Sequence, residues 1–408
     1  MDNIRSTSRS TPSTFSDVRE KMLTRVLTHL HTGHLTIQFP SGNVRTFHGT
    51  NSAVTSMVAD MTIHSWSAIS RMLKTNDIGL GESYMDGSWS TQDLSSLLNL
   101  LCANLQALEK VLNDSKIWQI IHKFLHIFNR NSRKGSRRNI SYHYDLGNDF
   151  YELWLDETMT YSSAFRKNGD MTLANAQIEK YRQLAVHLGL KEGDKVLEIG
   201  CGWGGFAEFA VTEYGCDVTG LTLSVEQKQF AEKRMEQKGL SDNARFLLKD
   251  YRDMEGQFDH IVSIEMLEAV GQEYWPTYFA IMSKVLKKGG RAVIQSITID
   301  HAAYHSYANQ PDFIQRYIFP GGMLPSLPML ERPLADAGLH LVSESGYASH
   351  YARTLDQWRQ RFNAAWPQFG EQQFDNRFKR MWDLYLAYCE GGFRAGMIDV
   401  KQMLLMHK

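Results

Sequence analysis

Residues 196–206 read Val-Leu-Glu-Ile-Gly-Cys-Gly-Trp-Gly-Gly-Phe. An apolar run typical of a buried strand leads into a turn with glycine at positions 200, 202 and 204, and helical spacing follows over 206–214. Glycine at a strand-to-helix turn lets the backbone pass close to a ligand where a Cβ would clash. The stretch predicts a ligand-binding loop, and the simpler alternative is a tight structural connection.

The residues around this loop narrow the class of ligand. A phosphate-gripping P-loop is excluded because the Gly-Lys-Ser/Thr ending is absent. A dinucleotide site would have an acidic residue about 20 positions further on for the ribose hydroxyls, yet the next expected strand ends in Thr222-Leu223-Ser224. The loop suits S-adenosylmethionine, whose amino-acid end approaches the glycines without an anion pocket.

The sequence on both sides of the loop alternates between helical and strand patterns over residues 171–300. The expected helices are 173–188 and 225–238; the expected strands are 195–199, 217–223, 245–248, 260–264 and 291–296, with a turn at 287–290. This alternation predicts an α/β fold with a doubly wound parallel sheet.

Ligands in such sheets lie beyond the carboxyl ends of the strands. That rule gathers five positions around one crevice: Gly200, Thr222, Asp250, Glu265 and Ser296. The segment from Asp300 onward is rich in aromatic residues and has a long helical pattern at 374–393. We expect this segment to form an aromatic lid over the crevice.

Composition describes a soluble globular chain. Its 408 residues allow a catalytic domain and a smaller one, and 43% hydrophobic residues with a net charge of −1 do not indicate nucleic-acid binding. No run of about 18 apolar residues predicts a transmembrane helix, and no apolar signal core is present, so a cytoplasmic location is expected. The four cysteines lack metal-ligand spacing, so no metal site is expected.

The N-terminal part is expected to form a separate small α+β domain. Residues 1–16 are rich in Ser and Thr and predict a disordered tail, with a targeting peptide as the alternative. Within 17–128, the strands 34–40 and 44–47 predict a hairpin, and a loop is expected at 79–89. A helical pattern from Asp93 to Phe128 indicates domain core, with a membrane-facing surface as the alternative for its second half.

Residues 129–140 form a basic linker. They carry Arg130, Arg133, Lys134, Arg137 and Arg138. Two interpretations stay open: a solvated hinge, or a patch attracted to anionic lipid, where each basic residue contributes about 1 kcal/mol.

Several further motifs resemble those of the cyclopropane fatty acid synthases. They are 141–151, 159–164, the glycine loop with Trp203, 222–227, 250–253, 268–271, 317–322 and 393–395. The resemblance spans roughly residues 75–400, and 81–89 resembles the amino-terminal domain of the longer bacterial members. It implies a Rossmann-like S-adenosylmethionine-dependent methyltransferase covering 141–408, which methylates the double bond of an unsaturated phospholipid acyl chain.

The resemblance also implies the residues that line the cofactor site. They are Tyr161, Ser162, Glu198, Gly200, Cys201, Gly202, Trp203, Gly204, Thr222, Leu223, Ser224, Gln227, Tyr251 and Arg252. Methyl transfer would leave a carbocation on the acyl chain, and a dry aromatic pocket would exclude water and stabilise the charge.

Ring closure requires a base. In relatives a bicarbonate, held by a cysteine, a glutamate, a histidine, a backbone group and a tyrosine, removes the proton. Here Glu268, Tyr351 and Ile297 match three of these positions, whereas Ser163 replaces the cysteine and Gln295 the histidine. The bicarbonate site is therefore altered.

An extra acid, Glu265, lies three residues before Glu268, and the two could share a helical face. We expect a carboxylate to act as the base, with Glu268 orienting Tyr351 and Glu265, or Glu268 itself, accepting the proton. The alternative for Glu265 is a structural carboxylate. Cys389 aligns with a cysteine once suspected of catalysis, and His143 is a further crevice candidate.

Four functions follow in order of preference. The first is cyclopropane formation, the second a methyl-branched alkene made by the same carbocation route, and the third a non-catalytic lipid-binding protein; methylation of a small molecule is the least favoured. Expected partners are unsaturated phospholipid acyl chains, an anionic membrane surface at the inner face, and a second copy in a homodimer. No nucleic-acid partner is expected.

Overall fold

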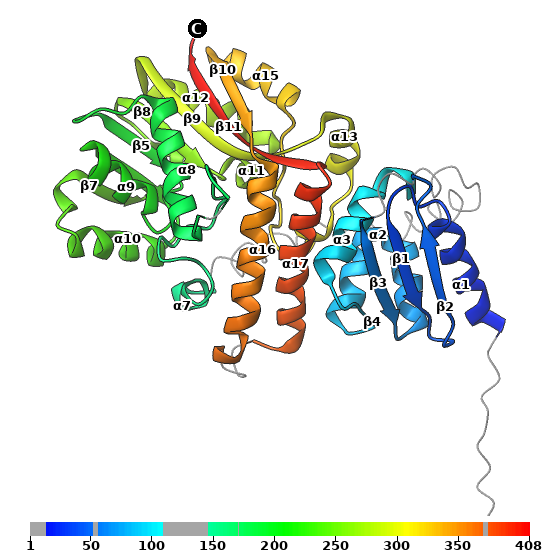
Figure 1. Cartoon of the computed structure of the whole chain (residues 1–408). Coiled ribbons are helices and arrows are strands. Elements are labelled where there is room, and N and C mark those ends of the chain that lie inside the picture. Colours follow the sequence, from blue (N-terminus) through cyan, green and yellow to red (C-terminus); the bar gives the residue numbers. More distant parts are fainter. Residues whose placement is uncertain (1–13, 52–55, 109–145, 170, 370–373) are drawn as a thin grey trace, which may run out of the picture. The chain divides into compact units, whose positions relative to one another are not determined.

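The computed structural model describes residues 14–51, 56–108, 146–169, 171–369 and 374–408 (Figure 1). Contacts divide the chain into two compact units: Met1–Asn131 with Asn376–Leu384, and Ser132–Asp375 with Tyr385–Lys408. Most of the expected tail, the helical pattern beyond residue 108, the basic linker at 129–140 and His143 lie outside the described residues. No helix within the described ranges is long and apolar enough to cross a bilayer.

The first unit combines helices with a small four-stranded sheet. Its elements are α1 (Thr14–Leu27), β1 (His34–Gln38), β2 (Val44–His48), β3 (Val58–Ile63), α2 (Trp66–Met85), β4 (Trp89–Ser90) and α3 (Leu94–Ala103). The strands pair in the order β2-β1-β3-β4, and β1 and β2 form the expected antiparallel hairpin. Asp93 caps α3 by accepting a hydrogen bond from the amide of Ser96 at 3.2 Å, so that helix begins where the sequence predicted.

The loop expected at 79–89 is wrong for most of its length, because α2 continues to Met85. The helix kinks at Thr75 and Asn76, which have non-helical dihedral angles. Past the kink, a Cβ on Gly79 would lie 2.1 Å from the backbone oxygen of Arg71. Glycine is therefore required here for close packing inside a helix and does not mark a loop.

The second unit contains a seven-stranded sheet in the order β10-β11-β9-β8-β5-β6-β7. Its strands are β5 (Lys195–Ile199), β6 (Asp217–Thr222), β7 (Ala244–Leu248), β8 (Phe258–Ile264), β9 (Leu286–Ile299), β10 (Leu339–Gly346) and β11 (Ile398–His407). The five strands from β5 to β9 pair in parallel, which confirms the predicted sheet.

Two features of this sheet differ from the prediction. The turn expected at 287–290 is wrong, because these residues belong to β9, which carries a register shift against β8. The segment after Asp300, which was expected to form a lid, also contributes to the sheet: β10 and β11 extend it as antiparallel strands. The chain therefore returns to the sheet at its last strand.

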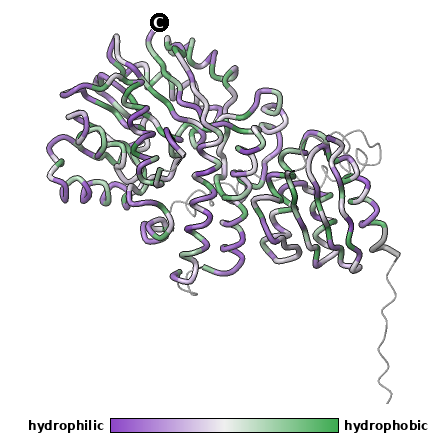
Figure 2. Tube along the Cα trace, in the orientation of Figure 1, coloured by the Kyte–Doolittle hydropathy of each residue, from purple (hydrophilic) through white to green (hydrophobic). Residues whose placement is uncertain are grey.

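Helices cover both faces of the sheet. On one face, α8 (Leu173–Leu188), α9 (Gly205–Tyr214) and α10 (Val225–Gln237) pack over Val196, Val218 and Val293. On the other, α12 (Trp275–Val285) and α15 (Leu327–Asp336) pack over Leu197, Ile261 and Ile294. Successive strand residues thus face opposite cores, and α10, half of it in solvent, is mostly hydrophilic (Figure 2).

The remaining helices of the second unit precede or connect the strands of this sheet. They are α7 (Asn148–Glu152), α11 (Leu267–Val270), α13 (His301–Asn309), α14 (Phe313–Tyr317), α16 (Ala348–Ala365) and α17 (Asn376–Arg394), whose residues 376–384 belong to the first unit.

Candidate active site

The glycine loop joins β5 to α9 in a conformation that only glycine adopts readily. Gly200, Gly202 and Gly204 have φ values of +83°, +50° and +80°. The amides of Gly200 and Cys201 donate to the carbonyl of Leu221 at 3.0 and 2.8 Å, which ties the loop to β6. A Cβ on Gly202 would meet no atom within 4 Å, so the space beside this residue is open to a ligand.

The residues beside the loop fit a cation-bearing cofactor. Glu198 is 2% exposed, and its Oε2 has no hydrogen-bond partner among the described residues. Burial raises the pKa of this carboxyl group well above its usual range. A buried carboxyl group without a partner needs a ligand donor or a proton, and the ammonium group of S-adenosylmethionine meets that need.

The end of β6 supplies a second polar group to this site. The hydroxyl of Thr222 donates to the side-chain Oε1 of Gln227 at 2.8 Å, and the hydroxyl of Ser224 accepts from the backbone amide of Gln227 at 3.2 Å. These bonds leave the side-chain Nε2 of Gln227 as a donor. Leu223 is 72% exposed at the same strand end, so its side chain is available to a bound cofactor.

Other predicted cofactor residues have different surroundings. Trp203 is 5% exposed, and its indole donates to Oδ1 of Asn148 at 2.7 Å, so it anchors α7 to the loop. The thiol of Cys201 is buried, which raises its pKa. Arg252 is exposed and bonded to Asp250 at 2.6 Å, beside a partly buried Tyr251.

Residues 160–163 are held by α8. Nζ of Lys180 donates to Oγ of Ser162 at 2.7 Å, and the amide of Gln177 donates to the carbonyl of Ser162 at 2.9 Å. Both α8 side chains are fully buried. Sequence reasoning missed them, although a lysine on the buried face of a helix between Ala176 and Leu184 was a visible signal.

Four separate segments meet at the carboxylate of Glu265. Its Oε1 accepts from the amide of Ser163 at 2.8 Å and from Nε2 of Gln295 at 2.9 Å, and its Oε2 accepts from the hydroxyl of Tyr351 at 2.6 Å. Gln402 of β11 donates to Oε1 of Gln295 at 3.0 Å, which directs Nε2 of Gln295 toward Glu265. The predicted positions 163, 295 and 351 thus all donate to one protein carboxylate.

Glu268 lies in a separate position. One of its oxygens accepts a hydrogen bond from the amide of Ile297, and Oε2, which is buried, has no partner among the described residues. Although the side chain keeps some exposure, its carboxyl group is enclosed. Burial, and then the like charge of Glu265, raise the pKa of Glu268 to about 8.

Two details of the predicted carboxylate arrangement are wrong. Tyr351 is oriented by Glu265 and not by Glu268. Glu265 and Glu268 do not share a helical face, because Glu265 precedes α11 and has a left-handed φ of +52°. This φ is rare for a residue with a Cβ and marks local strain at a candidate functional site.

Aromatic rings pack against the ring of Tyr351. Its ring lies 4.5 Å from that of Phe393 and 6.0 Å from that of Trp358, which in turn lies 5.3 Å from Tyr161. The hydroxyls of Tyr161 and Tyr385 are 2.7 Å apart. Cys389, half-buried on α17, contributes to raising the pKa of Tyr161, Tyr351 and Tyr385, so it lies near this aromatic cluster.

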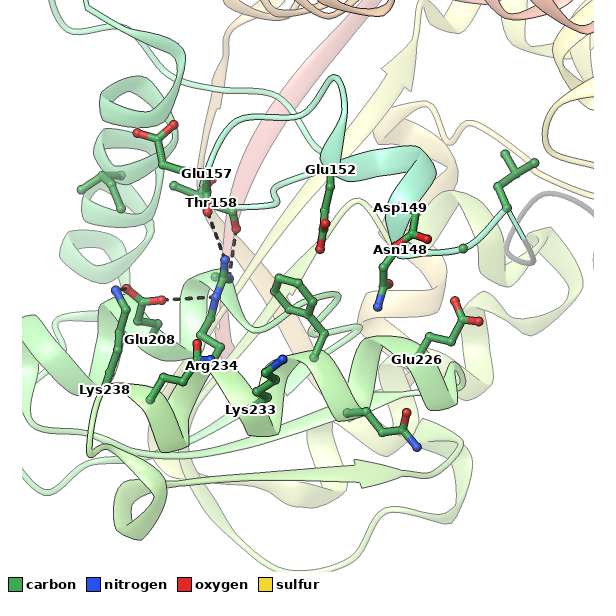
Figure 3. Close-up of a pocket in the computed structure, with 17 residues that line it drawn as sticks. Asn148, Asp149, Glu152, Glu157, Thr158, Glu208, Glu226, Lys233, Arg234 and Lys238 are labelled. Atoms are coloured by element: carbon green, nitrogen blue, oxygen red, sulfur yellow. Dashed lines mark hydrogen bonds and ion pairs between the residues drawn. The ribbon is translucent and has the colours of Figure 1, made fainter. Parts of the chain in front are cut away.

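A separate cavity of about 800 Å³ lies between α7 and α10 (Figure 3). None of the predicted site residues lines it. Figure 3 shows Arg234 reaching from α10 toward residues 157 and 158, where its guanidinium donates to the carbonyls of Glu157 and Thr158 at 3.2 and 3.0 Å. The same group donates to the carbonyl of Trp203 at 3.0 Å, so Arg234 links residues 157 and 158 to the glycine loop.

A parallel sheet covered on both faces, with a glycine loop after its first strand and a buried acid beside it, defines the fold class of S-adenosylmethionine-dependent methyltransferases. The family model for mycolic acid cyclopropane synthetase matches residues 131–403. The chain belongs to this family.

Relatives match nearly the whole chain. The tuberculostearic acid methyltransferase UfaA1 of Mycobacterium tuberculosis is 37% identical over 402 residues, which cover 96% of this chain and 91% of that protein. The cyclopropane-fatty-acyl-phospholipid synthase of Escherichia coli K12 is 37% identical over 356 residues, covering 85% and 87%.

Solved structures match the second unit's fold. The cyclopropane synthase MmaA2 of M. tuberculosis aligns with a TM-score of 0.60 at 33% identity, over 68% of this chain and 99% of that one. The mycolic acid cyclopropane synthase CmaA1, solved with S-adenosylhomocysteine, aligns with a TM-score of 0.58 at 34% identity, over 66% and 98%.

Proposed function

We propose that this protein transfers a methyl group from S-adenosylmethionine to the double bond of an unsaturated phospholipid acyl chain and closes a cyclopropane ring. The observation that carries the proposal is the carboxylate of Glu265, set among aromatic rings near the glycine loop. Family membership supports the same reaction class.

The cofactor would be held at the carboxyl ends of β5 and β6. Glu198, the backbone at Gly200–Gly204, Gln227 and Tyr161 are the proposed contacts, with Ser162, Leu223, Tyr251 and Arg252 at the rim. When bound, S-adenosylmethionine supplies an electrophilic methyl group to the alkene. Because an alkene is a poor nucleophile, holding both reactants in register must supply much of the acceleration.

Side chains of the protein then stabilise the carbocation on the acyl chain and remove its proton. Tyr351, Trp358 and Phe393 exclude water from the carbocation and present aromatic faces to it. Glu265 is held by three donors and accepts the proton that leaves the chain. Loss of that proton from the new methyl group returns its bonding electrons to the cation and closes the ring.

Bicarbonate is not required in this proposal. The three donors that would hold an anion at positions 163, 295 and 351 already bind Glu265. Added bicarbonate should therefore leave the rate unchanged, while Glu265→Gln should lower it by about 100- to 10,000-fold, the usual worth of a general base. A Glu265→Gln enzyme at full rate, or strict bicarbonate dependence of the parent, would contradict this assignment.

A second product follows if the proton leaves from a neighbouring chain carbon, which gives a methyl-branched alkene. The replacement of the expected cysteine and histidine by Ser163 and Gln295 favours this candidate, because the changes fall around the base. Cofactor carrying a trideuterated methyl group separates the two. A cyclopropane keeps two deuterons, and the branched alkene keeps three; mass spectrometry of the released fatty acids reads the difference.

The membrane part of the proposal concerns the first unit and the linker. Residues 17–128 would be an accessory domain for lipid, and the basic linker at 129–140 would draw the enzyme to the inner, anionic face of the membrane. The need to reach a bilayer acyl chain supports this, as does the family match with a phospholipid-directed relative. A homodimer stays a prediction, which sedimentation at several concentrations would test.

A non-catalytic lipid-binding role is the remaining alternative. The open space at Gly202 and the unpartnered Glu198 disfavour it, because a silent site needs neither. Calorimetric titration with S-adenosylmethionine discriminates: absence of binding would support the non-catalytic role.

A further inference from the structure

Lys180 is a buried cation without a role in the proposed reaction as described above. It lies on α8 with no exposed surface, and its Nζ lies 4.5 Å from the centre of the Tyr181 ring. Its hydrogen bond is to Oγ of Ser162, a neutral group, at 2.7 Å. Within the described ranges, no carboxylate oxygen lies within 4.0 Å of this ammonium group, so the group forms no ion pair.

A buried ammonium group without an ion-pair partner destabilises the folded state. Burial accordingly lowers the pKa of Lys180 to about 7, while the charges of Glu265, Asp156 and Glu198 act in the opposite direction. Glu265 is the largest of these three electrostatic partners. The cation therefore interacts with the carboxylates by its field, without contact.

The chain also links Lys180 to Glu265 through two adjacent residues. Ser162 accepts from Lys180, and the next amide, that of Ser163, donates to Glu265 at 2.8 Å. Gln177 fixes the same turn by donating to the carbonyl of Ser162. A shift of Lys180 would therefore move the amide that holds the base.

We propose that Lys180 is a positioning residue for Glu265: its buried ammonium group, held by Ser162, keeps the Glu265 carboxylate ionised and keeps the Ser163 amide directed at it. This inference rests on the proposed role of Glu265 as the base. It assigns the positive charge that stabilises the ionised form of the Glu265 carboxylate beside Tyr351.

The titratable groups around Lys180 and Glu265 come from several elements. Asp156, before the 160–163 turn, and Glu198, on β5, act on Lys180. Glu268, on α11, is repelled by the charge of Glu265, and Tyr351, on α16, donates to Glu265. All of these are anionic or neutral, and Lys180 is the cation among the groups that influence Glu265. Removing its charge should therefore raise the pKa of Glu265, because an opposite charge stabilises the ionised form.

The test compares pH–rate profiles of methyl transfer to vesicles of monounsaturated phosphatidylglycerol. Lys180→Met keeps the length of the side chain and removes its charge, and Lys180→Gln is a second neutral variant if the first folds poorly. The acidic limb of both should move up by about 1 to 3 pH units. Lys180→Arg, which keeps the charge, should restore the parental limb at least in part. Lys284→Met, on the exposed face of α12, is the matched control.

Ser162→Ala separates the charge from the hydrogen bond. It removes the 2.7 Å contact but leaves the cation buried, so its acidic limb should stay near that of the parent even if cofactor affinity falls. An unmoved limb in the neutral Lys180 variants would overturn the inference, as would an equal shift in Ser162→Ala. A parent that methylates no lipid would instead refute the proposed function, and the two failures are distinguishable.

Discussion

Replacing Glu268 by glutamine is expected to stabilise the folded protein at alkaline pH, because the fold opposes the ionisation of this carboxyl group. Burial and the neighbouring Glu265 raise its pKa to about 8 from its usual value of 4.5. The carboxyl group thus holds its proton longer when folded than when unfolded. Its destabilising effect is absent below pH 4.5, the unfolded value, and grows as the pH rises toward about 8.

The size of the effect follows from the shift. At about 1.4 kcal/mol per pH unit, a rise to about 8 sets an upper limit of about 5 kcal/mol. Because part of the side chain is exposed and screened by solvent, we expect about 1 to 3 kcal/mol. In a domain of this size each kcal/mol moves the melting temperature by about 2 to 4 °C.

The assay is thermal unfolding of the apoprotein at pH values from about 5 to 8.5, followed by circular dichroism. The melting temperature of the parent should fall more steeply with pH than that of Glu268→Gln, and the two curves should meet at the acidic end. Glu273→Gln, an exposed neighbour, is the control and should follow the parent. Parallel curves for Glu268→Gln and the parent would show that the Glu268 carboxyl group is not strained in the fold.

Three further predictions concern the cofactor, the base and the membrane. Gly202→Val should lower the affinity for S-adenosylmethionine by more than about tenfold in calorimetry, because the side chain would fill the open space beside the loop, whereas Gly193→Val, also a left-handed glycine with nothing nearby, should bind normally. Tyr351→Phe removes a 2.6 Å hydrogen bond to Glu265 and should lower kcat by about 10- to 100-fold with unchanged cofactor affinity; a normal kcat would mean that the hydroxyl does not orient the base. Reversing the basic residues of the linker to Glu should weaken cosedimentation with anionic vesicles, an effect that salt should imitate in the parent. Equal binding of the parent to neutral and anionic vesicles would reject this electrostatic part.

The parallel half of the sheet was readable because its signals are local. β5 is a short apolar run between a turn and a glycine loop, and α8 has apolar residues at helical spacing between a threonine cap and Gly189, so both were predicted at their observed bounds. β11 was missed because the helical pattern of α17 dominated that part of the chain, and its pairing with β9 joins residues about a hundred positions apart.

The sequence predicted which residues belong to the candidate site but not which of them are hydrogen-bonded to one another. Positions 163, 265, 268, 295 and 351 were identified as a set, yet which carboxylate receives which donor depends on the left-handed backbone at Glu265, a tertiary constraint with no sequence signature. Gln402 was missed because it acts through Gln295, which is distant in sequence. Lys180 left a signal, its place on the buried face of a helix, but that pattern did not indicate its partner Ser162.

Because Gln402 lies near the C-terminus, its hydrogen bond to Gln295 can form only late in the synthesis of the chain. The N-terminal parts of a protein emerge and fold first during translation. β5, β6 and the glycine loop are made well before β11, whereas Gln295 lacks the partner that directs its amide toward Glu265 until β11 has paired with β9. A nascent chain is thus expected to become competent for cofactor before it becomes competent for chemistry. Such an order would prevent an incompletely synthesised enzyme from forming carbocations that it cannot deprotonate.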